Sequence, residues 1–216
     1  MLVPRLPRHG HADRFSEAAS RITGDELLVA AREVLAVGRE LGDRVTVAGF
    51  SLGGLLTAWI AQHESVDRAV AIAPFLGVAV LPSRLMKAAA EVAMRLPNSF
   101  QWWDPFLRER QMPPHGYPRY STHAIAHAYL VARDLQRDAS QTAPLTRDIV
   151  LVNNSHESAV NNRAIRKLEA SWRAHGADVQ RIVLHGLPPS HDVIEPMRKS
   201  GLADRVYPQL LEVIDP

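Results

Sequence analysis

The chain has 216 residues and contains neither cysteine nor a long uninterrupted run of apolar residues. Without cysteine it can form no disulfide bond and no thiolate metal site. No stretch reaches the roughly 18 apolar residues that a membrane-spanning helix needs, so stable membrane insertion is not expected. The N-terminus lacks the apolar region of a signal peptide, and the cytoplasm is the expected location. The length suits one domain with a sizeable buried core.

An excess of charge of one sign is also missing, because the formal net charge is only +2. The basic residues are spread along the chain without a cluster, so nucleic acid is not an expected partner. Ten histidines are present, but only His123 and His127 have helical spacing, and no carboxylate motif accompanies them. That pair is more typical of a solvated helix face than of a metal site. Oligomeric state is left open by the sequence.

The most informative segment that is present leads from a β-branched apolar run at residues 45–50 into the pattern Gly49-x-Ser51-x-Gly53. This pattern is typical of a nucleophile elbow, in which a strained serine projects from a sharp strand-to-helix turn. Gly49 and Gly53 would let strand and helix approach closely. The N–H of Leu52 would lie at a helix N-terminus and could donate to an oxyanion. In the alternative, Ser51 is only a helix N-cap.

The rest of the chain alternates between strand and helix patterns, which predicts an α/β fold with a mostly parallel sheet and helices on both faces. A capping box, Thr23-Gly-Asp-Glu26, opens a helix through about residue 41. Residues 2–4 are predicted to be the end of a short strand. The other predicted core elements are strands at 45–50, 66–73, 148–153 and 179–184, with a helix at 52–62.

With these features the chain resembles the α/β-hydrolases, in the branch of small bacterial carboxylesterases and monoacylglycerol-lipase-like enzymes. The resemblance implies the chain order Ser, acid, His. Glu157, in Glu157-Ser-Ala-Val160 after the strand at 148–153, fits the acid position. The family usually has Asp there, and the longer Glu side chain can still reach a histidine. In the alternative, Glu157 is a solvated residue in the first turn of a helix.

The histidine is expected in the loop after the strand at 179–184. His191, in a Ser-His-Asp setting, fits the family better than His185, and Asp192 is a second carboxylate that mutation can test as the acid. The resemblance implies a serine hydrolase that cleaves carboxylic esters through an acyl-enzyme on Ser51, with no cofactor. Hydrolysis of peptide, thioester or carbon–carbon bonds uses the same residues and stays open.

Between residues 74 and 144 the regular alternation stops, and helical patterns at 83–96 and 121–137 flank turns rich in proline and aromatic residues. Family members commonly carry a cap here. We therefore expect a hydrolase core at 1–74 and 144–216 and a helical cap at 75–143. A small ester with an apolar group is the expected substrate. Its pocket would be lined by Phe50, Phe75, Trp102 and Trp103, although large aromatics in a cap can equally well only attach it to the core.

Residues 4–10 resemble the family's turn after its fourth strand, so the strands that precede it are expected to be missing. The strand at 45–50 would then be a sheet edge or would pair with residues 2–4. The second oxyanion donor would also be lost, unless His9-Gly10 supplies it. Losing one donor typically costs on the order of 10²- to 10³-fold in turnover. A catalytically inactive remnant or binding scaffold is therefore the alternative to an active enzyme.

Overall fold

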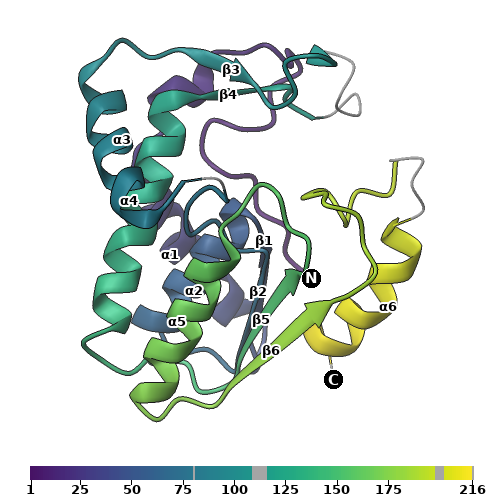
Figure 1. Cartoon of the computed structure of the whole chain (residues 1–216). Helices are drawn as coiled ribbons and strands as arrows, with labels where there is room; N and C mark the ends of the chain where they lie inside the picture. Colours follow the sequence, from purple (N-terminus) through teal and green to yellow (C-terminus); the bar gives the residue numbers. More distant parts are fainter. Residues whose placement is uncertain (80, 109–115, 198–201, 216) are drawn as a thin grey trace.

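A four-stranded parallel sheet lies at the centre of the protein, with strand order β1-β2-β5-β6 (Figure 1). The structure is a computed structural model that describes residues 1–79, 81–108, 116–197 and 202–215. The sheet confirms the predicted α/β class. Its strands are β1 (Thr46–Phe50), β2 (Arg68–Ile72), β5 (Ile149–Asn154) and β6 (Val179–Leu184).

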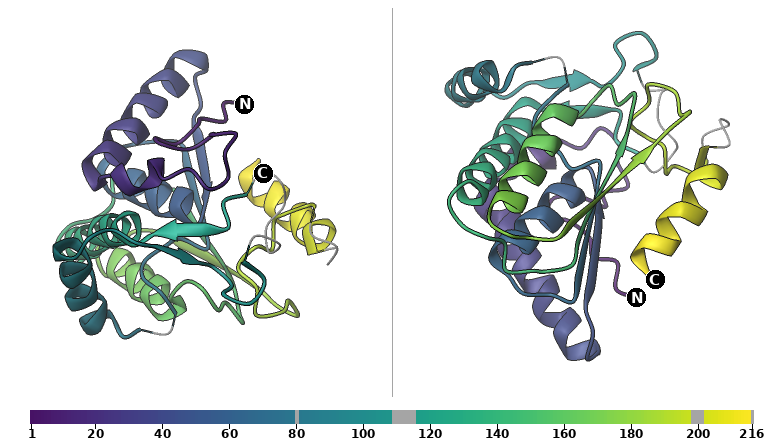
Figure 2. Two further views of the ribbon diagram at one scale, coloured as in Figure 1. Left: turned by 90° about the horizontal axis from the view of Figure 1, so that it is seen from above. Right: turned by 60° about the horizontal axis from the view of Figure 1, so that its bottom comes forward.

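Helices cover both faces of the sheet, as Figures 1 and 2 show. Several helices cover one face, and α6 (Leu202–Ile214) packs on the opposite face against the apolar side chains of β2, β5 and β6. Two apolar layers therefore enclose the sheet. The helices are α1 (Gly24–Leu41), α2 (Leu52–His63), α4 (Thr122–Ala139), α5 (Asn162–Ala174) and α6 (Leu202–Ile214).

Local sequence explains the positions of these elements. The Thr23 hydroxyl accepts a hydrogen bond from the N–H of Glu26 at 3.1 Å, which is the predicted N-cap of α1. All six residues of β5 are buried, and the first four are apolar, as expected for a strand inside a parallel sheet. The predicted strands and helices of the core agree with the observed ones to within about two residues.

Strand β1 is an edge of the sheet, because its only strand partner in the described chain is β2. The prediction of a strand end at residues 2–4 is wrong, since these residues have no regular secondary structure. The N–H of Ser51 donates to the carbonyl of Ile72 at 2.9 Å. Because parallel strands alternate their hydrogen bonds between two neighbours, the main-chain groups of residues 46, 48 and 50 face the open edge.

The segment between β2 and β5 begins with helix α3 (Ser83–Arg95) and a short antiparallel ribbon of β3 (Phe100–Trp102) and β4 (Arg119–Ser121). The sequence did not predict this ribbon, because three-residue strands are too short to show an alternating pattern. Helix α4 follows, and its side chains Val131, Ala132 and Leu135 are buried in the main core. The predicted cap range therefore includes a helix that also packs in the main core.

The N-terminal segment, residues 9–16, also contacts the β3–β4 ribbon and lies beside it in Figure 1. The Tyr117 hydroxyl accepts from the N–H of His11 at 2.8 Å, and Arg119 donates to the carbonyl of Phe15 at 2.7 Å. A short 3₁₀ helix (Ala18–Arg21) continues the segment. None of the helices described in residues 1–79, 81–108, 116–197 and 202–215 is both long and apolar enough to cross a membrane.

Candidate active site

Ser51 lies at a sharp turn between β1 and α2, with φ 55° and ψ −109°. A positive φ is unfavourable for a residue with a Cβ and costs about 1–3 kcal/mol unless its surroundings enforce it. Two hydrogen bonds enforce this backbone conformation at Ser51. The N–H of Ser51 donates to Ile72, and the carbonyl of Ser51 accepts from the N–H of Phe75 at 3.0 Å. The elbow geometry predicted from the sequence is thus present.

Close approach of strand and helix depends on two glycines, of which the sequence identified one. A Cβ on Gly49 would collide with the backbone of Gly53 and lie 2.6 Å from the Thr57 hydroxyl. A Cβ on Gly54 would lie 2.7 Å from the carbonyl oxygen of Ile72. Gly53 has nothing within 4 Å of an added Cβ. The expectation that Gly53 itself must be small is therefore wrong, and Gly54 has that role.

The three residues predicted as a triad are in contact. His191 Nε2 lies 2.7 Å from Ser51 Oγ, and His191 Nδ1 lies 3.1 Å from Glu157 Oε2. With Nδ1 donating to the carboxylate, Nε2 is the ring acceptor that faces the serine hydroxyl. The side chain of His191 is 19% exposed and that of Glu157 only 1%. His185, the other histidine of this region, is exposed.

The contacts come from the carboxyl ends of three strands, the edge where α/β sheets commonly bind ligands. Ser51 follows β1. Glu157 lies in the segment after β5, residues 155–161, which we call the acid loop. His191 lies in the segment after β6, residues 185–193, which we call the histidine loop. Because β5 and β6 are neighbours in the sheet, the two loops lie side by side.

Glu157 is held in its charged form by its neighbours. Burial alone would raise the pKa of its carboxyl group, but the hydrogen bond and charge of His191 and the amides of Ala159 and Val160 outweigh burial. The net result is a pKa below the ordinary value. Oε1 accepts from the N–H of Ala159 at 2.8 Å, while Oε2 faces His191. Glu157 is therefore a buried carboxylate with both oxygens hydrogen-bonded, and not the solvated residue that the sequence left as an alternative.

Leu52 is the first residue of α2, so its N–H has no partner within the helix and lies at the positive end of the helix dipole. That is the predicted position of an oxyanion donor. The alternative donor pair, His9-Gly10, belongs to the N-terminal loop. There His9 Nδ1 lies 2.8 Å from the carbonyl of Pro7, and its ring packs edge-on against Tyr117.

Comparisons with known proteins identify the family of the chain. Residues 1–210 match the family model described as the alpha/beta hydrolase family. The chain belongs to this family. No curated protein sequence matches it.

Solved structures show the same hydrolase fold at low sequence identity. A monoacylglycerol lipase from Paleococcus ferrophilus has 19% identity and a TM-score of 0.64, with 90% of this chain and 76% of the lipase covered. A soluble variant of a monoglyceride lipase from Saccharomyces cerevisiae, crystallised with a substrate analogue, has 10% identity and a TM-score of 0.68, with 91% and 71% covered. One of the metagenome-derived lipolytic enzymes LipS and LipT has 16% identity and a TM-score of 0.63, with 97% and 80% covered.

The four aromatics predicted to line the pocket of this hydrolase occupy different surroundings. Phe50 stacks on the imidazole of His191, with ring centroids 4.7 Å apart. Phe75, whose N–H donates to the carbonyl of Ser51, has its side chain buried in the main core. Trp102 meets Phe15 edge-on at 6.2 Å, whereas Trp103 is 49% exposed and packs against Tyr120. Phe50 is the one of the four with a described ring contact to the triad.

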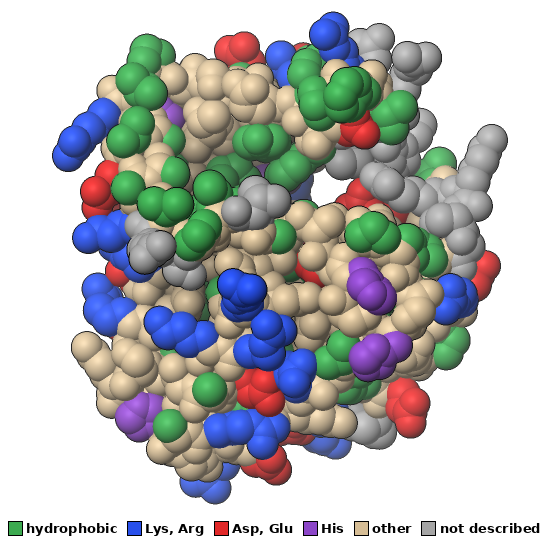
Figure 3. Space-filling model, in the orientation of Figure 1, with side chains coloured by type: hydrophobic (Ala, Val, Ile, Leu, Met, Phe, Trp, Pro, Cys, Tyr) green, Lys and Arg blue, Asp and Glu red, His purple; other side chains and the backbone are tan. Residues whose placement is uncertain are grey.

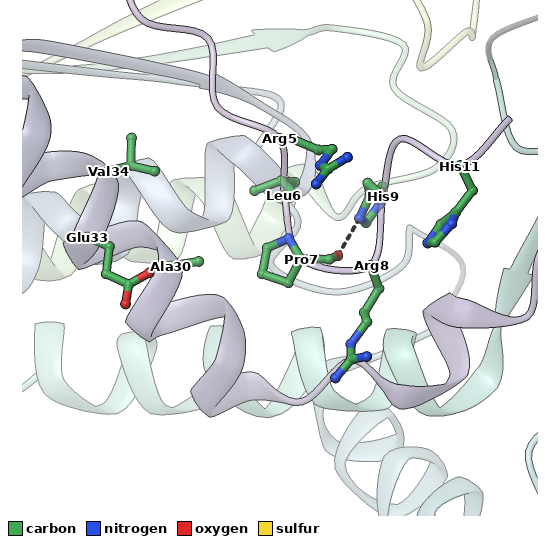
Figure 4. Close-up of a pocket in the computed structure, with 9 residues that line it drawn as sticks. All are labelled: Arg5, Leu6, Pro7, Arg8, His9, His11, Ala30, Glu33 and Val34. Atoms are coloured by element: carbon green, nitrogen blue, oxygen red, sulfur yellow. Dashed lines mark hydrogen bonds between the residues drawn. The ribbon is translucent and has the colours of Figure 1, made fainter.

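The space-filling view shows a hollow between the ribbon region and the sheet, with hydrophobic side chains on its upper wall (Figure 3). A separate cavity of about 410 Å³ lies between the N-terminal loop and α1. Figure 4 shows Arg5, Arg8, His9 and His11 on its loop side and Glu33 on the helix side. Its lining includes none of the three triad residues.

Metal-binding groups are not assembled in the described parts of this hydrolase, where no cluster of three or more His, Asp or Glu residues is found. The predicted pair His123 and His127 is half-buried rather than fully solvated. His123 Nε2 lies 2.9 Å from the carbonyl of Leu96. Burial, followed by the charge of His123, lowers the pKa of His127.

Sequence reasoning missed the residues that hold the two loops together, chiefly Asn154 and Ser158. The Asn154 amide contacts main-chain carbonyls of the histidine loop, and so does the Ser158 hydroxyl. A signal existed for Asn154, because it is a polar residue at the end of a fully buried apolar strand. Its partners are more than thirty residues away, and no local pattern indicates them.

Proposed function

We propose that this protein is a serine hydrolase that cleaves carboxylic esters through an acyl-enzyme intermediate on Ser51. Membership of the alpha/beta hydrolase family supports a hydrolase. The observation that carries the finer proposal is the continuous line of contacts from Glu157 through His191 to Ser51, at 3.1 and 2.7 Å. Contacts of this length between an acid, a base and a strained serine are the arrangement that activates a hydroxyl nucleophile.

In the first step, Ser51 Oγ attacks the ester carbonyl carbon while His191 Nε2 takes the hydroxyl proton. The carbonyl oxygen becomes an oxyanion, and the N–H of Leu52 donates to it at the end of α2. The tetrahedral intermediate then collapses, and the bond to the alcohol breaks. His191 returns the proton to the departing oxygen, which leaves the acyl group on Ser51.

In the second step, water attacks the acyl carbon and His191 again takes the proton. The ester bond to Ser51 breaks, the proton returns to Oγ, and the carboxylic acid is released. Glu157 keeps its charge throughout. Its carboxylate holds Nδ1 protonated, so that Nε2 is free to accept, and it stabilises the imidazolium that forms in each step.

The substrate that we propose is a small ester with an apolar acyl or alcohol group. The hydrophobic upper wall of the hollow in Figure 3 supports this choice. We further propose that residues 75–143 act as a cap over the site, with the β3–β4 ribbon as the part beyond the core. Trp102 is a candidate lining residue in this proposal, because its ring is only partly buried between Phe15 and Arg119.

A binding scaffold without catalytic activity is the second candidate. The observation in its favour is that β1, the strand that carries Ser51, is a sheet edge with exposed residues Thr46 and Ala48. Among the described residues, Leu52 is also the only one whose position identifies it as an oxyanion donor. A hydrolase with one donor would retain a reactive serine but would turn over slowly.

Reaction with a fluorophosphonate separates the two candidates. Intact mass spectrometry should show one adduct per chain, and the adduct should be absent from Ser51→Ala with an unchanged circular dichroism spectrum. Short-chain and medium-chain p-nitrophenyl esters would then test turnover, with Ser65→Ala as a control serine on the surface. A folded protein that forms no adduct would favour the scaffold and would exclude the serine hydrolase.

A further inference from the structure

The last residue of β5, Asn154, joins the histidine loop to the sheet. Its side chain is buried, with the residue only 2% exposed. The amide nitrogen Nδ2 donates to the carbonyl of Pro188 at 2.8 Å and to the carbonyl of Ser190 at 3.2 Å. Ser190 directly precedes His191. One buried amide therefore holds the main chain that carries the histidine.

The same residue also holds the acid loop. Its side-chain oxygen accepts from the N–H of His156 at 3.0 Å. Its main-chain carbonyl accepts from the N–H of Glu157 at 3.3 Å and from the side-chain amide of Asn162 at 2.8 Å. The side-chain nitrogen of Asn154 thus binds the histidine loop, while its side-chain oxygen and its main-chain carbonyl bind the acid loop.

The histidine loop needs such contacts because its own backbone supplies few. Pro188 and Pro189 have no N–H, so this part of the loop can only accept hydrogen bonds. Ser158 donates to the carbonyl of Pro189 at 2.7 Å, between the two carbonyls that Asn154 contacts. Three successive carbonyls before His191 are therefore bound by side chains from the end of β5 and the acid loop.

We propose that Asn154 is a positioning residue that sets the distance between Glu157 and His191. This inference rests on the proposed serine-hydrolase function and deepens it, because Asn154 acts through His191 rather than by touching the substrate. In the described contacts, Asn154 is the one residue besides Glu157 itself whose side chain has hydrogen bonds to both loops. Moving the histidine loop would lengthen the contacts from His191 to Glu157 and to Ser51 together.

The expected effect on catalysis follows from the sensitivity of proton transfer to geometry. A displacement of about 1 Å at a reacting group can lower turnover by about 10²-fold. Asn154→Ala removes the hydrogen bonds from Nδ2 to the carbonyls of Pro188 and Ser190, so the main chain before His191 is no longer tied to β5 by this side chain. We therefore expect kcat for a small activated ester to fall by about 10²-fold. KM should stay nearly constant, because the substrate surfaces are untouched.

Asn153→Ala is the matched control. Asn153 is the preceding residue of β5, is equally buried, and donates to the carbonyl of Asn154 without a described contact to the histidine loop. Its removal should leave kcat close to that of the unmodified protein. If Asn154→Ala does not fold, Asn154→Ser keeps a small polar side chain that is too short to reach both carbonyls, and the same fall in kcat is expected.

The low-field proton NMR signal of His191 Nδ1–H gives a readout that does not need activity. This signal should be present in the unmodified protein and in Asn153→Ala, and should weaken or shift in Asn154→Ala. An inactive protein that still shows this pattern would overturn the proposed function and leave the positioning role intact. An unchanged signal in a folded Asn154→Ala would overturn the positioning role, whatever the activity.

A double-mutant cycle completes the test, because two residues that act through one contact have non-additive effects. In the background of Glu157→Gln, the substitution Asn154→Ala should lower kcat by much less than 10²-fold. An equal loss in both backgrounds would show that Asn154 acts independently of the pair of Glu157 and His191, and would contradict the proposal.

Discussion

The elbow and the two loops that complete the site are stabilised in different ways. The residues that form the elbow are consecutive, with Gly49 and Gly54 allowing the close approach, and main-chain groups at the end of β2 hold the backbone of Ser51. The acid and histidine loops depend on side chains, chiefly Asn154 and Ser158, that bind carbonyls far away in the sequence. The residue pattern of the elbow is thus local in the sequence, whereas the contacts of the acid and histidine loops need the assembled sheet.

The largest expected effect comes from replacing Ser51, the proposed nucleophile. Ser51→Ala removes the attacking atom and should lower kcat by about 10⁶-fold, as removal of a catalytic serine does when the other groups remain. Kinetics with an activated ester would measure this loss, with circular dichroism as the control for folding. Retained turnover would show that Ser51 is not the nucleophile and that the elbow has only a structural role.

The acid should have the next largest effect. Glu157→Gln keeps the shape of the side chain but no longer fixes the tautomer of His191, and we expect a loss of about 10⁴-fold in kcat. Asp192→Asn is the matched control, because Asp192 adjoins His191 in sequence while Nδ1 of His191 faces Glu157. A loss in Asp192→Asn without one in Glu157→Gln would reverse the two assignments.

A pair of glycine substitutions tests whether the elbow is determined locally. Gly49→Ala should destabilise the fold by about 3 kcal/mol, because the added Cβ meets the backbone of Gly53, which cannot move aside cheaply. Gly53→Ala should raise the free energy of unfolding by about 0.5–1 kcal/mol, since it replaces glycine inside a helix without a clash. Urea denaturation of both variants would measure the contrast. Equal effects would contradict the packing that distinguishes the two glycines.

The smallest expected effect is the pH dependence of stability contributed by Glu157. Its pKa in the folded protein lies below the ordinary value of 4.5, so the folded state favours the charged form. The corresponding stability is fully present above pH 4.5 and is lost as the pH falls through the folded pKa. The difference in unfolding free energy between the unmodified protein and Glu157→Gln should therefore narrow below pH 4.5. A difference that stays constant with pH would contradict this assignment.

The sequence predicted the core strands well, because β2 and β5 each contain four consecutive apolar residues and α1 begins at a capping box. It did not predict the β3–β4 ribbon, whose strands have three residues each. Arg119 of β4 packs over the rings of Phe15, Phe100 and Trp102, and the contact with Phe15 joins segments about a hundred residues apart. Contacts between segments so far apart in the chain produce no periodic pattern in the sequence.

The sequence by itself determined the elbow and the order of the candidate residues Ser51, Glu157 and His191. An apolar run followed by glycine at 49 and serine at 51 was enough to predict the turn, although contacts with Ile72 and Phe75 enforce its backbone conformation. Only the tertiary structure decided that Glu157 meets His191, 34 residues later in the chain. That contact exists because β5 and β6 pair in parallel and end together. The edge position of β1 was likewise decided by strand pairing, which depends on distant segments that local sequence patterns do not specify.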